Sequence, residues 1–242
     1  SDTLHGKTGM RTLMVGPDVE ELAASMEGRD YYGQRVAFQT ENIGEPLLIE
    51  KYGLKVKRYP NCGSLHRTLD CVLALKAQYG FDASDVADVL VHLPAIHSRN
   101  LMYPNPVSPM EAKFSLEYSV AAALHHGNVT LHDYEPEQIA APHVRDLMPL
   151  VRKQVVDKLE NEFPTEVQIE LKDGRRLNEQ VYMHKGTAAN PLSEAEIATK
   201  FRDCTQTFDA ATASKLQALL FGMEELADTR QLTALLQADT SK

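Results

Sequence analysis

Residues 166–183, EVQIELKDGRRLNEQVYM, decide the fold class of this 242-residue chain. Apolar and polar residues alternate on both sides of Lys172-Asp173-Gly174-Arg175, and an Asp-Gly pair between two such runs is typical of a hairpin turn. A third alternating run, ADVLVHLP at 87–94, predicts a further strand. Because helix signals fall irregularly around these strands, we expect an α+β fold with a small, mostly antiparallel sheet, not a doubly wound parallel sheet.

Capping signals indicate where helices begin and end. The run SPME at 108–111 combines a capping box with proline at the first helical position, and Ser193 with Glu196 repeats the capping box. Gly80 and Gly127 stand where left-handed residues end helices. We expect one helix to start at Asp18 and another at Ser193. Three more are expected over 64–79, 108–126 and 143–155. An amphipathic pair within 208–237 is expected to break near Asp228.

The composition is that of a globular protein with an acidic balance. It is 43% hydrophobic with a formal net charge of -9, and this charge argues against a nucleic-acid partner. No apolar run approaches the roughly 20 residues that span a bilayer. Three cysteines, Cys62, Cys71 and Cys204, form no CxxC pair, so we expect a reducing, cytoplasmic location. The start, SDTLHGKTGM, has no secretory pattern and no initiator Met, which indicates a processed or truncated chain.

Basic residues gather in one short stretch despite the acidic balance. They are Lys55, Lys57, Arg58, His66 and Arg67, and they make either a solvated loop or a pocket for an anion. The alternation of LKVK at 54–57 predicts a short strand with both lysines on one face. On that face Lys57 would bind a carboxylate, act as a base if desolvated, or simply be the solvated lysine of an edge strand.

Two further positions are candidates for proton transfer. His66 and Asp70 are four residues apart on an expected helix, so the carboxylate would orient the imidazole; the alternative is a solvated helical pair. Cys62 and His66 lack a second ligand pair, so we expect no metal there. Tyr118 lies within an apolar helix and is either a core tyrosine or a phenol that donates to a developing enolate.

Three segments together resemble the MmgE/PrpD family. They are KRYPNCGSLHRTLD at 57–70, PMEAKFSLEYSVAAALHHG at 109–127 and NPLSEAEIATKF at 190–201, in the family's order. The family contains dehydratases, decarboxylases and epimerases of small polycarboxylates such as 2-methylcitrate and cis-aconitate. Motifs for nucleotide or phosphoryl chemistry (GxGxxG, GxxxxGK[ST]) and for common hydrolases (GxSxG, HExxH) are absent from the sequence.

The resemblance implies a two-layer α+β lid whose active site faces an all-helical domain, with acid/base chemistry and no cofactor. It implies that Lys57, His66 and Tyr118 are catalytic and face the substrate. The basic stretch then reads as a polycarboxylate pocket, so we expect the three residues Lys55, Arg58 and Arg67 to bind substrate. We add the expectation that the Asp70 carboxylate orients the His66 imidazole without touching the substrate.

The resemblance covers roughly residues 15 to 242, whereas family members also contain the all-helical domain, which is almost wholly missing here. We expect an N-terminal segment (1–53), the lid (54–205), and C-terminal helices (206–242) that would pack on the helical domain. The chain would be a fragment, a separate lid, or one subunit of a split enzyme, with negligible turnover alone. The alternative is a non-catalytic module that binds carboxylates or a protein.

The last two expected helices carry an apolar stripe at helical spacing. Its members are Leu216, Leu219, Leu220, Met223, Leu232, Leu235 and Leu236. Monomers seldom expose contiguous apolar patches beyond a few hundred Å². We therefore expect a homo-oligomer or a helical partner subunit.

Overall fold

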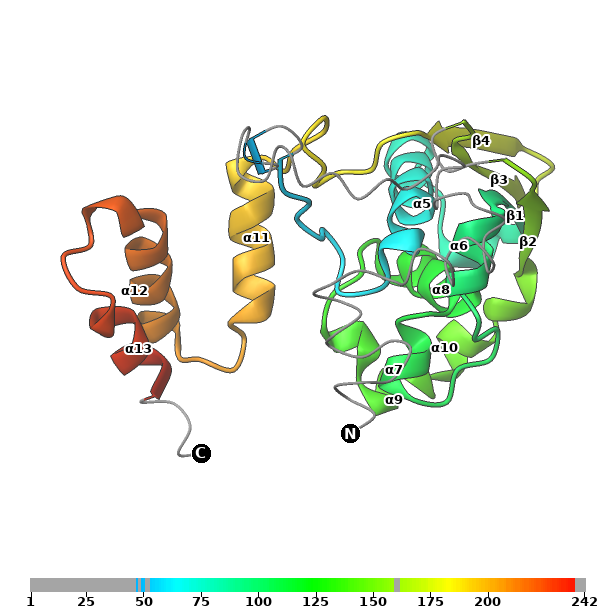
Figure 1. The fold of residues 1–242 in the computed structure, drawn as a ribbon. Helices are drawn as coiled ribbons and strands as arrows, with labels where there is room; N and C mark the ends of the chain where they lie inside the picture. Colours follow the sequence, from blue (N-terminus) through cyan, green and yellow to red (C-terminus); the bar gives the residue numbers. More distant parts are fainter. Residues whose placement is uncertain (1–46, 48, 51–52, 159–161, 238–242) are drawn as a thin grey trace, which may run out of the picture. The chain divides into compact units, whose positions relative to one another are not determined.

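The computed structural model describes residues 47, 49–50, 53–158 and 162–237 (Figure 1). The helix expected from Asp18 lies outside these residues. The chain divides into two units, Ser1–Tyr52 and Gly53–Lys242, and the description below concerns the second. No helix in the described ranges is long and apolar enough to cross a membrane.

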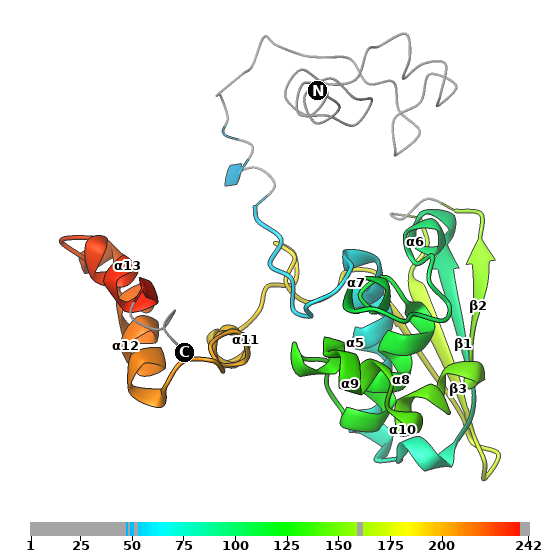
Figure 2. The ribbon, with the colours of Figure 1, turned by 90° about the horizontal axis from the view of Figure 1, so that it is seen from below.

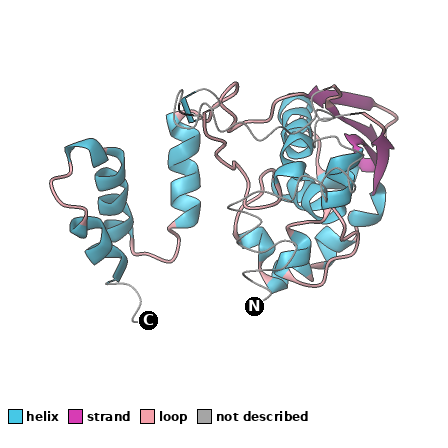
Figure 3. Cartoon of the chain, in the orientation of Figure 1, coloured by secondary structure: helices cyan, strands magenta, loops and turns pink. Residues whose placement is uncertain are grey.

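Four strands form one mixed sheet in the order β2-β1-β3-β4. The strands are β1 (Val86–Pro94), β2 (Val151–Val156), β3 (Thr165–Leu171) and β4 (Arg176–Val181). β1 pairs with β2 in parallel, while the β1–β3 and β3–β4 pairs are antiparallel. The α+β class with a small, mostly antiparallel sheet is therefore confirmed, and Figure 3 shows this separation of strands from helices.

The hairpin of β3 and β4 forms as its sequence predicts. Gly174 has a φ of 88°, a left-handed conformation that favours glycine, and its N–H donates to the Leu171 carbonyl at 2.9 Å. Along β3 every second residue is buried, and these are Thr165, Val167, Ile169 and Leu171. One face of the sheet thus belongs to the core.

Two helices cover that face, as Figure 2 shows. They are α5 (His66–Tyr79), which packs on β3 and β4, and α8 (Leu116–His126), which packs on α5 and β2. The predicted left-handed residues end both helices, with φ of 62° at Gly80 and 72° at Gly127. The core that they enclose includes Leu65, Leu69, Leu75, Val89, Val91, Leu116, Val120, Leu124 and Ile169.

The remaining described α-helices are α6 (Ala95–Asn100), α7 (Pro109–Ala112), α9 (Pro136–Ile139), α10 (Pro142–Arg145), α11 (Glu194–Cys204), α12 (Ala210–Phe221) and α13 (Arg230–Gln237). The capping box of Ser193 and Glu196 is present at α11. The helix expected over 108–126 is instead two helices, α7 and α8. The reason is local: the Ser115 side chain accepts the Tyr118 N–H at 3.1 Å and starts a new helix.

The helix predicted over 143–155 is wrong. The helical residues there are those of α10 and of a short 3-10 turn, Met148–Leu150, and the chain becomes β2 from Val151, which pairs with Val89 of β1. Pro149 lacks the N–H that a continuing helix needs, and the β-branched Val155 and Val156 favour a strand. Pairing with β1 then decides the conformation.

The strand predicted for LKVK is also wrong. Residues 54–57 belong to no strand of the described sheet, and Val56 instead donates its N–H to the carbonyl of Gly186 at 2.7 Å. Gly186 has a φ of 92°, and a Cβ built on it would stand 1.9 Å from the Val56 carbonyl oxygen. The segment after β4 is therefore held against residues 54–58 at a contact that only glycine permits.

The C-terminal pair of helices is confirmed, with its break between Phe221 and Arg230, near the predicted Asp228. α12 packs against α13, but of the seven stripe residues only Leu216 is buried. Leu220, Met223 and Leu236 are each at least 40% exposed. Much of the apolar stripe is thus uncovered within the described residues.

We expect Gly186→Ala to destabilise the fold by roughly 3 kcal/mol, because it combines a left-handed φ with a backbone clash. Urea unfolding measures the cost, and faster hydrogen exchange at the Val56 amide would report local detachment. Gly174→Ala is the matched control: its φ is similarly positive, but nothing lies within 4 Å of the added Cβ. It should cost about 1 kcal/mol, and equal costs for both variants would contradict the close contact.

Candidate active site around His66

The centre of the candidate site is His66, the first residue of α5. A 3-10 turn (Gly63–Leu65) leads into it, and its side chain is fully buried. The ring of Tyr59 lies edge-on at 5.2 Å between centroids, and the ring of His184 lies at 4.9 Å. Neither ring nitrogen of His66 meets hydrogen-bond geometry with a partner among the described residues. Asn61 Oδ1, Thr68 Oγ1 and Thr165 Oγ1 share this state, so the missing bond alone does not assign a role to His66.

The surroundings of His66 keep it neutral. Burial, and then the charges of His184 and Lys57, lower the pKa of His66 to about 3. At neutral pH one ring nitrogen therefore carries a proton and the other a lone pair. Its lone pair can accept a proton, and a bound anion beside it would raise its pKa toward the range that acid/base catalysis needs.

Asp70 does not contact His66 directly. Its carboxylate accepts hydrogen bonds from the Tyr59 hydroxyl at 2.7 Å, from Arg58 at 3.2 Å and from the Lys185 N–H at 2.8 Å. Tyr59 thus stands between the two, with its hydroxyl on Asp70 and its ring on His66. Burial, and then Asp70, raises the pKa of Tyr59, so this hydroxyl stays a donor. Asp70 therefore reaches His66 only by way of Tyr59 and does not bond the imidazole as we expected.

The lysines of the basic stretch are exposed. Lys57 donates from Nζ to the Asn61 carbonyl at 3.0 Å, and its charge acts on His66. Lys55 is exposed and has no hydrogen-bond or ion-pair partner among the described residues. Arg58 is half-buried and lies 3.7 Å from Glu196 as well as against Asp70. The charge of Lys57 thus reaches His66, as does the smaller effect of Lys200.

Arg67 has a different environment. It is buried, and its guanidinium donates to the Phe163 carbonyl at 3.3 Å, just before β3. This bond joins α5 to the start of the strand. Binding of substrate by Arg67 would require the bond to break.

Tyr118 lies in the core of α8. Its hydroxyl donates to the Asp133 carbonyl, and burial raises its pKa. Its ring is 5.9 Å from that of Tyr134, whose hydroxyl accepts a 2.8 Å bond from the Asn61 side chain. The backbone carbonyl of Asn61 accepts the bond from Lys57, and its side chain bonds Tyr134. Contacts therefore run from Lys57 through Asn61 to Tyr134, whose ring lies beside that of Tyr118. The structure connects Tyr118 with Lys57 in this way, but among the described residues no hydrogen bond or ring contact joins Tyr118 to His66.

Sequence reasoning missed four residues of this environment: Tyr59, Asn61, Tyr134 and His184. Tyr59 and Asn61 lie inside the KRYPNCGSLHRTLD segment, so its pattern contained the signal. Tyr134 and His184 come from distant parts of the chain and stand in no motif. Only the fold brings them to the site.

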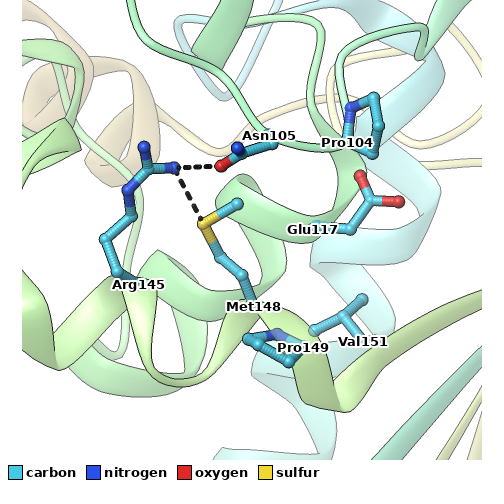
Figure 4. Close-up of a pocket in the computed structure, with 7 residues that line it drawn as sticks. All are labelled: Pro104, Asn105, Glu117, Arg145, Met148, Pro149 and Val151. Carbon is cyan, nitrogen blue, oxygen red and sulfur yellow. Dashed lines mark hydrogen bonds between the residues drawn. The ribbon is translucent and has the colours of Figure 1, made fainter.

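Two hollows lie near these elements, and neither is lined by Lys57, His66 or Tyr118. One, of about 340 Å³, is lined by Arg58, Thr130 and residues of α11 such as Lys200. The other, of about 430 Å³, is drawn in Figure 4. There Arg145 donates to the Asn105 side chain at 3.0 Å, opposite Glu117. His66 itself has no exposed surface, so it is covered in the structure.

The sequence of this chain is similar to a known protein family and to two known enzymes. The sequence profile of the MmgE/PrpD C-terminal domain matches residues 59–221. Cis-aconitate decarboxylase of Mus musculus is 26% identical over 200 residues, which is 78% of this chain and 41% of the relative. Cis-aconitate decarboxylase of Homo sapiens is 25% identical over 205 residues, with the same coverage. The chain spans about two fifths of the length of these relatives.

We expect His66 to make stability depend on pH. In the unfolded chain His66 binds a proton below its ordinary pKa of 6.5, whereas in the folded chain it stays neutral down to about pH 3. The free energy of unfolding should therefore fall as pH drops through this window, by up to about 1.4 kcal/mol per pH unit. Urea unfolding between about pH 7.5 and pH 4.5 measures the slope.

In His66→Gln this part of the slope should vanish. The control His132→Gln removes a surface histidine whose Nδ1 lies 2.8 Å from Glu135 and should keep the slope of the parent chain. If His66→Gln and the parent chain lose stability in parallel, His66 is not held neutral.

Proposed function

Because the chain belongs to the MmgE/PrpD family, as its three motifs predicted, we propose that it forms part of an enzyme that moves a proton on a small polycarboxylate. The observation that carries the proposal is the buried, neutral His66 imidazole, whose ring nitrogens make no hydrogen bond of normal geometry among the described residues and only approach the Tyr59 backbone. The two relatives are named for a reaction of cis-aconitate, so that tricarboxylate is the first candidate substrate.

In this proposal His66 is the general acid or base. Lys57 contributes a positive charge that attracts a substrate carboxylate and stabilises the charge that develops on the neighbouring carbon. The exposed Lys55 extends the same positive region. Arg58 reaches a substrate only by sharing its existing bonds to Asp70 and Glu196.

Substrate must reach an imidazole that is now covered. The cover is the ring of His184, in the segment that follows β4. That segment is held through the Lys185 N–H on Asp70 and through Gly186 on Val56. We propose that the His184 side chain turns away when substrate binds, since its own bond is only to the neighbouring Lys185 carbonyl.

We propose that Tyr118 acts through the contacts that run to Lys57 and not by direct transfer from its hydroxyl, which is already bonded to the Asp133 carbonyl. Removal of that bond would leave a buried carbonyl unpaired, at a cost of about 1–3 kcal/mol. Through Tyr134 and Asn61 the tyrosine instead fixes the backbone carbonyl that holds Lys57. Its role is then to position the lysine.

The described residues supply one side of such a site. Lys55 and Lys57 face solvent, and acid/base chemistry on a bound acid needs a second wall that excludes water. We therefore propose that a helical protein surface completes the site and that the isolated chain binds the acid but turns it over only slowly. The alternative, a non-catalytic carboxylate-binding module, predicts binding that does not depend on His66 and no turnover in any assembly.

Lys57→Ala should weaken cis-aconitate binding about tenfold, because the substitution removes the charge nearest the imidazole. Isothermal titration calorimetry measures this, with exposed Lys215→Ala as the control that keeps parental affinity. His66→Gln should bind within about threefold of the parent, and in an assembly with the helical surface that completes the site it should release CO₂ from cis-aconitate at least 10²-fold more slowly than the parent. If Lys57→Ala keeps the parental affinity, Lys57 does not bind a substrate carboxylate. If His66→Gln releases CO₂ as fast as the parent, His66 does not transfer the proton.

The uncovered apolar residues of α12 and α13 need a partner, and we propose that in the isolated chain a second copy supplies it. Light scattering at low micromolar concentration should show a dimer or larger species. Leu220→Glu together with Leu236→Glu should yield a monomer, since each places a charge on an exposed apolar position. Gln217→Glu with Gln231→Glu adds the same charge at polar positions and should leave association unchanged. A monomeric parent chain would contradict the proposal.

A further inference from the structure

Three histidines outside the predicted catalytic set meet where α8 ends beside α10. His125 and His126 are the last two residues of α8, and His143 is the second residue of α10. The two helices are in contact, and Figures 1 and 2 show them next to one another. All three side chains are exposed, so no packing requirement of the core explains why they gather.

The three rings already face one another. The centroids of His125 and His143 are 4.2 Å apart, those of His125 and His126 are 4.8 Å apart, and those of His126 and His143 are 5.8 Å apart. One nitrogen from each ring can be chosen so that all three lie within 4.8 Å of one another. With Zn–N bonds of about 2.1 Å, tetrahedral ligands are roughly 3.4 Å apart. Small rotations of exposed rings close this difference.

A second, independent feature sits behind the cluster. Nδ1 of His126 is bonded to the carboxylate of Asp133, which is only 3% exposed. The other oxygen of this carboxylate accepts bonds from the Thr130 N–H at 2.6 Å and the Thr130 hydroxyl at 2.9 Å. A fixed carboxylate on one nitrogen of a histidine orients the ring and leaves Nε2 for a metal, which is the arrangement found behind most metal-binding histidines.

The charges nearby are also compatible with a cation. The cluster is at the C-terminal end of α8, where the helix dipole favours positive charge. The positive charge of Lys76 disfavours a bound cation, but its Nζ is held by the Phe81 carbonyl at 3.1 Å. Asp133 supplies a formal negative charge directly behind His126.

We propose that His125, His126 and His143 bind one divalent transition-metal ion of the zinc type. Three imidazole nitrogens select zinc, nickel, cobalt or copper over magnesium and calcium, which prefer oxygen ligands. Three protein ligands leave a fourth position for water or an external ligand. The ion would join the end of α8 to α10, and this site does not depend on the function proposed for His66.

Zinc binding to the tag-free chain tests the proposal. Isothermal titration calorimetry should show one equivalent of Zn²⁺, with affinity lowered at least tenfold in His143→Ala and in His125→Ala. His132→Ala is the matched control, because it removes a neighbouring exposed histidine that pairs with Glu135, outside the cluster. Cys204→Ser removes the exposed cysteine, and it too should bind as the parent does. Circular dichroism checks that each variant folds.

Cobalt gives an independent readout, because its visible absorption reports the number and type of ligands. The parent chain should develop an intense tetrahedral spectrum at one equivalent of Co²⁺, and His143→Ala should not. Three results would each overturn the site: no stoichiometric Zn²⁺ binding, parental affinity in His143→Ala, or an equal loss in His132→Ala or Cys204→Ser.

Discussion

The carboxylate of Asp70 is the constraint on which the candidate site depends. It accepts hydrogen bonds from two segments: the one before α5, through Tyr59 and Arg58, and the one after β4, through the Lys185 N–H. Asp70 itself belongs to α5, so one side chain joins three separate stretches of chain. The rings that cover His66 come from the two stretches that Asp70 holds. Without this carboxylate, the Tyr59 hydroxyl would lose its partner in a buried environment, at a cost of about 1–3 kcal/mol.

The basic residues of the stretch around His66 fall into two groups, those bonded within the fold and those exposed to solvent. Arg58 is neutralised by Asp70 and Glu196, and Arg67 is bonded to a backbone carbonyl within the core. Within the basic stretch, Lys55 and Lys57 are the two exposed cations for which the described residues supply no ionic partner. A charge without a counter-ion attracts an anion from solution more strongly than a paired charge does. The basic stretch is therefore partly structural, and its anion-binding capacity is concentrated in the two lysines.

Local signals fixed much of the fold, and pairing with distant segments decided the rest. The Asp173-Gly174 turn, the left-handed Gly80 and Gly127, and the capping box at Ser193 all depend on neighbours in sequence, so they were predictable. β2 was not, because its conformation follows from its alignment on β1 after Pro149 stops the helix. Residues 54–57 have the alternation of a strand but pair with no strand of the described sheet. For the site, the motif contained His66, Lys57 and Tyr59, whereas His184 is brought to His66 only by the course of the chain after β4.

Asp133 relates the two proposed sites to each other. Its backbone carbonyl accepts the Tyr118 hydroxyl, and its side chain holds His126. Thr130 fixes that side chain from the other direction, so a metal that pulls on His126 acts on a residue with little freedom to move. Tyr118 packs on Tyr134, which accepts a bond from Asn61, so Asp133 is shared by the histidine cluster and by the residues around Lys57. His66 and its cover are held by Asp70 instead. The two proposed sites therefore rest on different carboxylates.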